Sequence, residues 1–277
     1  MMKTTTLEEF RAELLATGGY ETADDHRAPK RAKKCGWTTF RFSLGVSHVF
    51  PMCAITEPFG LLNTDRWAHY CFRTVQIAEK MGMKVMLEGW KQREAYKGPV
   101  MYLCNHMSTV ETILLPPIVL TYGPFNVVAK ASLNHLPFLE SAAKHMGMLP
   151  LGRKSPREDL MYMLKVGVER IQAGNSFLIF PQGSREKVFS RKLYSSIGAK
   201  LAEKAGCPVV PIVVDTRCQP TREGGGLFKD FGPVDTAIDI RCACGPVIPH
   251  DKAKVMHEAA FDWMATKLES WNLPVER

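Results

Sequence analysis

The sequence predicts an α/β protein, with a mostly parallel sheet flanked by helices and an amphipathic helical segment at the N-terminus. With 277 residues, 45% of them hydrophobic, the chain can bury one large core or two small ones. Short apolar or alternating runs typical of strands recur between residues 84 and 242, and runs of helical length separate most of them. Strands that alternate with helices favour a layered fold whose strands run parallel.

Six short runs have the pattern of strands. Residues 84–88 alternate between polar and apolar side chains, and residues 100–104 form an uninterrupted apolar run after the turn at Gly98-Pro99. The remaining candidates are residues 125–129, 177–180, 209–214 and 237–242. We interpret these runs as the strands of the sheet.

Apolar residues at helical spacing mark the intervening segments. Residues 7–15 fit a short amphipathic helix ended by Gly18-Gly19, and residues 66–81 fit a longer helix closed by Gly82. Further helices are predicted at residues 109–115, 139–145, 157–173, 195–205 and 251–271.

The first 65 residues combine a charged part with an apolar part. A basic cluster (Arg27, Lys30, Arg31, Lys33 and Lys34) runs directly into an apolar stretch that contains Trp37, Phe40, Phe42, Leu44, Val46, Val49 and Phe50. Segregation in this order is typical of a segment that lies in a bilayer interface. The alternative is a helical hairpin packed on the core with solvated lysines. We predict that residues 1–65 form a membrane-interface segment and that residues 66–277 form the main domain.

The net charge of the chain limits the classes of possible binding partner but does not select one of them. Lysine and arginine exceed aspartate and glutamate by 36 to 28, which gives a formal net charge of +8. A positive charge favours an anionic partner, such as nucleic acid, anionic lipid, a phosphorylated substrate or an acidic carrier protein. The chain contains no nucleic-acid-binding motif, so we expect no nucleic acid partner.

No leader, membrane span or metal site is expected. Residues 1–39 are polar and lack the apolar region of a signal peptide. The best candidate for a span, residues 44–62, is interrupted by His48, Pro51, Glu57 and Pro58. The eight cysteines are scattered without a C-x-x-C pair, so we expect reduced, mostly buried thiols in a cytoplasmic protein.

His106 follows the predicted strand 100–104 at its carboxyl end, where open α/β sheets place their ligands. If His106 precedes the next helix and Glu111 lies in its first turn, the carboxylate can meet the imidazole and stabilise imidazolium. This arrangement suits a histidine that takes a proton from a hydroxyl. Ser108-Thr109-Val110-Glu111 also has the pattern of a capping box, which is the structural alternative for Glu111. The alternative for His106 is a loop histidine with no task.

Four blocks in this chain resemble those of a known family. The run from Asn105 to Glu111 resembles the H-x4-D motif of the glycerolipid acyltransferase family, with Glu111 in place of the usual aspartate. The run from Gly147 to Arg153 is similar to its G-x-x-x-x-x-R block, Phe180-Pro-Gln-Gly-Ser-Arg185 to its F-P-E-G-T-R block, and Val210-Pro-Ile-Val-Val214 to its V-P-V block. The blocks follow in the family's order within residues 100–214.

The resemblance implies transfer of an acyl group from acyl carrier protein or coenzyme A to a lipid hydroxyl, without cofactor, metal or acyl-enzyme. His106 would be the general base and Glu111 its orienting partner. The positions that match those holding the acceptor's phosphate or other polar group are Lys130, Arg153, Gln182, Gly183, Ser184 and Arg185. Arginine binds phosphate bidentately, and a glycine lets backbone N–H groups approach an anion. Gln182 stands where most members have glutamate, which removes a negative charge beside the acceptor.

The default acceptor that the resemblance implies is 1-acylglycerol-3-phosphate. Gln182 leaves open the same chemistry on a lipid A precursor, an aminolipid or a specialised metabolite. A non-catalytic lipid- or carrier-binding relative is a further alternative. Because a product with two acyl chains stays in the bilayer, we expect a peripheral protein on the inner face of the membrane, with residues 66–277 as the acyltransferase domain.

Overall fold

The computed structural model describes residues 2–130, 140–141, 143, 147–151, 155–221 and 231–277. The chain divides into two compact units, each assembled from segments that are distant in sequence. The first consists of Met1–Lys91, Met107–Thr121 and Val214–Ala243, and the second of Gln92–His106, Tyr122–Val213 and Cys244–Arg277. The predicted division into residues 1–65 and 66–277 stays a prediction.

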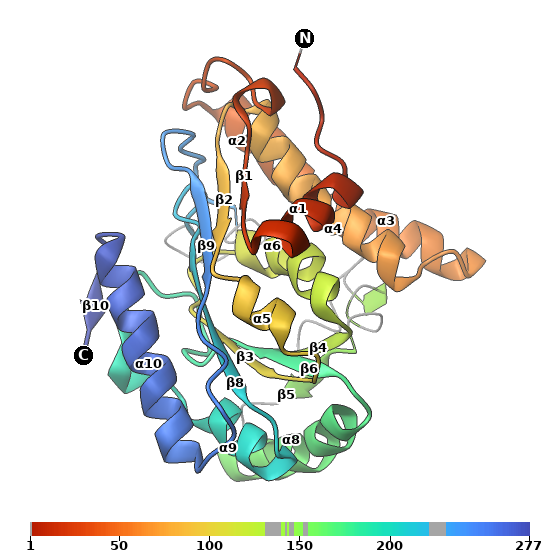
Figure 1. Cartoon of the computed structure of the whole chain (residues 1–277). Coiled ribbons are helices and arrows are strands. Elements are labelled where there is room, and N and C mark those ends of the chain that lie inside the picture. The colour runs from red at the N-terminus through yellow and green to blue at the C-terminus, as the bar shows by residue number, and fades with distance from the viewer. Residues whose placement is uncertain (1, 131–139, 142, 144–146, 152–154, 222–230) are drawn as a thin grey trace. The chain divides into compact units, whose positions relative to one another are not determined.

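Three strands of the first unit pair in the order β1–β2–β9 (Figure 1). β2 (Val85–Glu88) pairs in parallel with β9 (Ile240–Cys244), and Val85 lies opposite Ile240. β1 (Tyr20–Glu21) pairs antiparallel with β2. Along β2, Val85 and Leu87 are buried and Glu88 is exposed, as the alternation in its sequence predicts.

The helices of the first unit pack around α4 (Thr64–Lys80), which contacts α2 (Gly36–Ser47), α3 (Val49–Thr56) and α6 (Val110–Val119; Figure 1). α1 (Leu7–Thr17) begins with a capping box between Thr6 and Glu9 and ends at Gly18, whose φ of 74° is left-handed. The N-terminal part of the first unit also contains two short 3-10 helices, η1 (Asp24–His26) and η2 (Glu57–Phe59).

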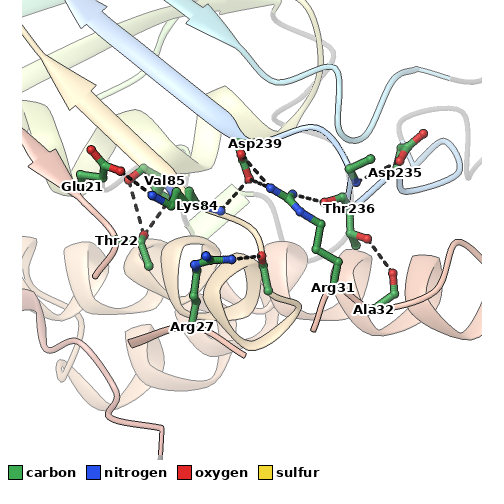
Figure 2. Close-up of polar contacts among 12 residues, drawn as sticks. Glu21, Thr22, Arg27, Arg31, Ala32, Lys84, Val85, Asp235, Thr236 and Asp239 are labelled. Atoms are coloured by element: carbon green, nitrogen blue, oxygen red, sulfur yellow. Dashed lines mark hydrogen bonds and ion pairs between the residues drawn. The ribbon is translucent and has the colours of Figure 1, made fainter. Parts of the chain in front are cut away.

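Three of the five residues of the basic cluster form ion pairs within the first unit, and Figure 2 shows the pair of Arg31 with Asp239. Arg31 binds Asp239 at 2.8 Å and also donates to the carbonyl of Thr236, while Lys34 binds Asp235 at 2.8 Å. Arg27 pairs with Asp24 at 2.8 Å. The ion pairs of Arg31 and Lys34 connect the chain before α2 to the segment before β9. They also compensate much of the positive charge that the sequence pattern assigned to a membrane surface.

The second unit contains a parallel sheet in the order β8–β3–β6–β4–β5. β3 (Met101–Cys104) lies between β6 (Ser176–Ile179) and β8 (Val209–Asp215), and β4 (Phe125–Lys130) and β5 (Leu149–Leu151) follow outward. Every residue of β3, β6 and β8 is buried. Uninterrupted burial explains why these strands are apolar throughout. A separate parallel pair joins β7 (Phe189–Ser190) to β10 (Val275–Glu276).

Helices of the second unit hold β3 in place. α9 (Ile197–Ala205) contacts β3 and packs between α8 (Pro156–Gln172) and α10 (Ala253–Ser270). Gly198 permits the close approach, because a Cβ at this position would lie 2.5 Å from the Leu103 side chain of β3. Shorter helical elements are α5 (Lys91–Ala95) and the 3-10 helices η3 (Leu120–Tyr122) and η5 (Arg191–Leu193), and the described residues 140, 141 and 143 are also helical.

The predicted fold class, a mostly parallel sheet flanked by helices, is confirmed. All six predicted strands are present with small shifts at their ends, and seven of the eight cysteines are buried as expected. The strands β1, β5, β7 and β10 were not predicted, because two or three residues are too few to show a period. The helix predicted at 139–145 lies largely outside the described residues.

One predicted helix end is wrong. α6 continues past Leu115 through Pro116 and Pro117 to Val119, although proline normally ends a helix. Nine of its ten residues are buried, the exception being Thr112. Burial of this apolar helix offsets the two backbone hydrogen bonds that the prolines remove.

Candidate active site

His106 follows β3 by two residues and is held by the loop after β6. Its ring stacks on Phe180, with ring centroids 4.3 Å apart and planes at 25°. The backbone N–H of Glu186 donates to the His106 carbonyl at 2.9 Å. Ring and backbone of His106 are thus both held by one loop of the second unit.

Glu111 lies in the first turn of α6 in the first unit and is fully buried. Its Oε1 accepts from the backbone N–H groups of Met107 at 2.6 Å and Ser108 at 2.7 Å. Its Oε2 accepts from the hydroxyls of Ser108 at 2.8 Å and Thr216 at 2.6 Å. A carboxylate has about four acceptor sites, and these four donors match them.

The predicted capping box is present only in part: the Glu111 carboxylate accepts from the Ser108 N–H, but the N-cap of α6 is Thr109, which makes no side-chain capping bond. The Ser108 hydroxyl in turn accepts from the Val110 N–H at 3.0 Å. The same contacts bear on His106, because Met107 and Ser108 directly follow it in the chain. Glu111 thus fixes the two peptide groups that directly follow His106 in the chain.

Sequence reasoning did not identify Thr216. It is fully buried, follows β8 and donates to a carboxylate 105 residues away in the chain. The only sequence signal available was its place directly after a predicted strand, where the sheets of α/β proteins carry functional side chains.

An ion-pair group lies beside Thr216 in the chain. Asp215 is fully buried and binds Arg217 at 2.9 Å and Arg241 at 2.7 Å. Burial alone would raise the pKa of the Asp215 carboxyl, but the hydrogen bonds from both arginines outweigh it and hold the pKa below its usual value. Burial raises the pKa of the nearby Cys218 thiol, which keeps this group protonated and non-nucleophilic at neutral pH.

The predicted acceptor residues lie largely on the loop that holds His106. Gly183 has a φ of 72°, which favours glycine, and its N–H donates to the Phe180 carbonyl at 2.9 Å. The Ser184 hydroxyl donates to Glu186 at 2.7 Å. Gln182 is 8% exposed and donates to the Val188 carbonyl at 3.0 Å. Arg185 follows on the same loop and is partly exposed.

Two further predicted residues cannot be placed in full. Lys130 is the last residue of β4, and the structure describes only its backbone. Arg153 lies outside the described residues. Across the described part of the chain, no group of three or more His, Cys, Asp or Glu side chains could hold a metal ion. The expectation that no metal or cofactor takes part stays a prediction.

These features define an α/β protein with a histidine at the carboxyl end of a buried parallel strand and a loop with the sequence Pro-Gln-Gly-Ser-Arg that contacts the histidine. A buried carboxylate follows the histidine five positions further along the sequence. The model of the Acyltransferase family matches residues 84–215, which include the histidine, the carboxylate and the loop. Thr216 is the first residue after this stretch. This stretch is similar to the acyltransferase family, and the resemblance of the chain to the glycerolipid acyltransferases is confirmed.

Two curated relatives illustrate the similarity. The 1-acyl-sn-glycerol-3-phosphate acyltransferase of Pseudomonas aeruginosa is 34% identical over 114 residues, which cover 41% of this chain and 43% of that protein. A chloroplastic enzyme of the same name from Brassica napus is 28% identical over 192 residues, 69% of this chain and 52% of the relative. The matched stretches thus span about half of these relatives or less.

A solved structure shows the same fold. The crystal structure of the 1-acyl-sn-glycerophosphate acyltransferase from Thermotoga maritima superposes with a TM-score of 0.62 and covers 85% of this chain and 95% of that chain. The sequences are 15% identical, so this similarity concerns the fold alone.

Proposed function

We propose that this protein is an O-acyltransferase that moves a fatty acyl chain from a thioester to the hydroxyl of a lysophospholipid-type acceptor, by default 1-acylglycerol-3-phosphate. The observation that carries the proposal is His106 at the end of β3, stacked on Phe180 and bound through its carbonyl by Glu186. The names of the curated relatives support this acceptor class.

In this proposal His106 acts as general base. Its imidazole removes the proton from the acceptor hydroxyl while the hydroxyl oxygen attacks the thioester carbonyl carbon. The carbon–sulfur bond of the tetrahedral intermediate then breaks, and the sulfur of coenzyme A or of acyl carrier protein leaves with the proton. Glu111 orients the histidine by fixing Met107 and Ser108 after it. Stacking on Phe180 favours the imidazolium that forms.

The proposed acceptor contacts come from cationic and loop residues. Arg185 lies on the loop that contacts His106, and Lys130 and Arg153 complete the proposed phosphate-binding set. Arginine and lysine suit a phosphate, because they provide several charged N–H donors. The loop residues Gly183 and Ser184 are proposed to face the same group. No metal or cofactor is required by this chemistry.

The proposal is tested by the mass of the product. Purified protein is incubated with 1-acylglycerol-3-phosphate and either acyl coenzyme A or acyl carrier protein carrying the same chain. We expect a diacylated product with consumption of one thioester per acceptor. A product only from a lipid A precursor, an aminolipid or another hydroxyl would assign the same chemistry to that acceptor. No thioester consumption with any acceptor, together with retained liposome binding, would identify a non-catalytic lipid-binding relative.

We further propose that α2, α3 and η2 contact the membrane surface. Trp37, Phe40 and Leu44 recur at helical spacing on one face of α2, and the first two are 65% and 56% exposed. Phe59, in η2, is 74% exposed. Phe42, on the opposite side of α2, is fully buried. Large apolar side chains gathered on an exposed surface mark an interaction site.

Apolar contact rather than charge would drive this binding. Three of the five basic residues before α2 form ion pairs within the first unit, which reduces the charge left for anionic lipid. No described helix is long and apolar enough to cross a bilayer. We therefore propose a peripheral protein on the inner face of the membrane.

The double variant Trp37→Ser, Phe40→Ser is expected to weaken liposome binding by about tenfold or more. Inserting an aromatic side chain into the interface contributes about 1.5–3 kcal/mol, and about 1.4 kcal/mol corresponds to tenfold in affinity. Sedimentation with vesicles measures the effect. Met161→Ser, at an exposed apolar residue of α8, is the matched control and should bind normally. Equal binding by the double variant and this control would contradict the interfacial assignment.

A further inference from the structure

The loop from Phe180 to Val188 is closed by one side-chain amide. Gln182 is 8% exposed, and its Nε2–H donates to the Val188 carbonyl at 3.0 Å. At the start of the loop, the Gly183 N–H donates to the Phe180 carbonyl at 2.9 Å. The side-chain bond therefore spans six residues and joins the two ends of the loop.

The far end of this loop has an independent anchor. Val188 leads directly into β7, which pairs with β10, and the Phe189 N–H donates to the Pro274 carbonyl at 3.0 Å. The Ser190 hydroxyl donates to Glu276 at 2.7 Å. Because Val188 is held from this side, the bond from Gln182 positions the loop rather than the strand.

The same loop holds the histidine. Phe180 stacks on the His106 ring at 4.3 Å, and the Glu186 N–H donates to the His106 carbonyl at 2.9 Å. Phe180 lies just before Gln182, and Glu186 lies within the segment that Gln182 closes. A change in loop conformation would therefore alter both of these contacts with His106.

We infer that Gln182 is a positioning residue, whose amide N–H closes the 180–188 loop and thereby sets His106 and presents Ser184 and Arg185. The inference rests on the proposed acyl transfer for its kinetic part. The donor is essential, because the Val188 carbonyl can only accept and a carboxylate has no proton to donate. The amide is thus required by the loop itself, and not only by a preference for a particular acceptor.

Two near-isosteric variants separate a missing donor from an added charge. Gln182→Met keeps the length and has neither donor nor charge, while Gln182→Glu adds a carboxyl that can donate only when protonated. We expect both variants to lose about tenfold in kcat/KM at pH 8, mostly in kcat, as loss of one buried hydrogen bond predicts. Relative to the unaltered protein, Gln182→Glu should recover towards about pH 5, whereas Gln182→Met should not.

Gln92→Glu is the matched control, because it adds the same charge at an exposed position of α5. It should behave as the unaltered protein at every pH. If Gln182→Met has normal kinetics and only Gln182→Glu is impaired, the residue acts through charge on the acceptor and the inference is wrong. Normal kinetics in both variants would also overturn it.

Hydrogen exchange provides a readout that needs no activity. In Gln182→Met, the amides of Gly183 and Glu186 should exchange about tenfold faster, because opening of the loop exposes them. Unchanged exchange would overturn the inference even if the protein is an active acyltransferase. Faster exchange in a protein without thioester turnover would instead leave the loop assignment standing and contradict the proposed function.

Discussion

Replacing His106 by alanine is expected to lower kcat by about a thousandfold, because general bases contribute about 10²–10⁴ to turnover. The acceptor hydroxyl is weakly acidic, and without the imidazole no positioned group takes its proton. The fold should persist, since the Glu186 N–H binds the backbone carbonyl of His106 and not its ring. The KM for the acceptor should change little, because the acceptor's phosphate is assigned to other residues.

The measurement is initial rate with 1-acylglycerol-3-phosphate at saturating thioester, together with thermal unfolding. His250→Ala is the matched control, because this histidine is exposed and lies in the same unit. It should retain full turnover. If His106→Ala keeps more than about a tenth of the activity, His106 is not the general base.

Replacing Glu111 by alanine should have the second largest effect, on both stability and turnover. Two backbone N–H groups and two hydroxyls would lose their acceptor in a fully buried site. Leaving buried donors unsatisfied costs about 1–3 kcal/mol each before relaxation, so we expect a loss of about 3 kcal/mol in the free energy of unfolding. Turnover should fall in addition, because the turn after His106 is released.

Glu111→Gln separates these two effects. The amide oxygen can still accept from Met107 and Ser108, and the amide N–H₂ can donate to hydroxyl oxygens that reorient. We expect an unfolding free energy close to that of the unaltered protein, with kcat lower by about tenfold because the proposed stabilisation of imidazolium by the Glu111 charge is lost. Glu203→Gln, at an exposed position of α9, controls for the change in net charge. Normal turnover in Glu111→Gln would show that the Glu111 charge has no part in catalysis and that the residue only stabilises the start of α6.

Local patterns account for what was predicted correctly. An apolar run such as 100–104 depends only on burial of that strand, so it could be recognised without knowing the rest of the chain. The two prolines led to a helix end at Leu115 that is wrong for α6. The sequence shows that prolines remove backbone hydrogen bonds, but it does not show the burial of the helix that compensates for them.

The pairing of charges illustrates the opposite case. The cluster of basic residues before α2 suggested an anionic lipid partner, yet Arg31 and Lys34 bind Asp239 and Asp235, about 200 residues further along the chain. Sequence proximity shows which charges are clustered, and only the fold shows which of them are compensated.

The sequence by itself determined the class of the fold, the place of His106 after a buried strand, and the loop of Gln182 to Arg185, because each depends on neighbouring residues. The tertiary structure alone decided the partners: Thr216 for Glu111, Val188 for Gln182 and Phe180 for His106. Parallel strands place their carboxyl ends at one edge of a sheet, so contacts among the segments that follow depend on strand order. Strand order is a property of the whole packed chain.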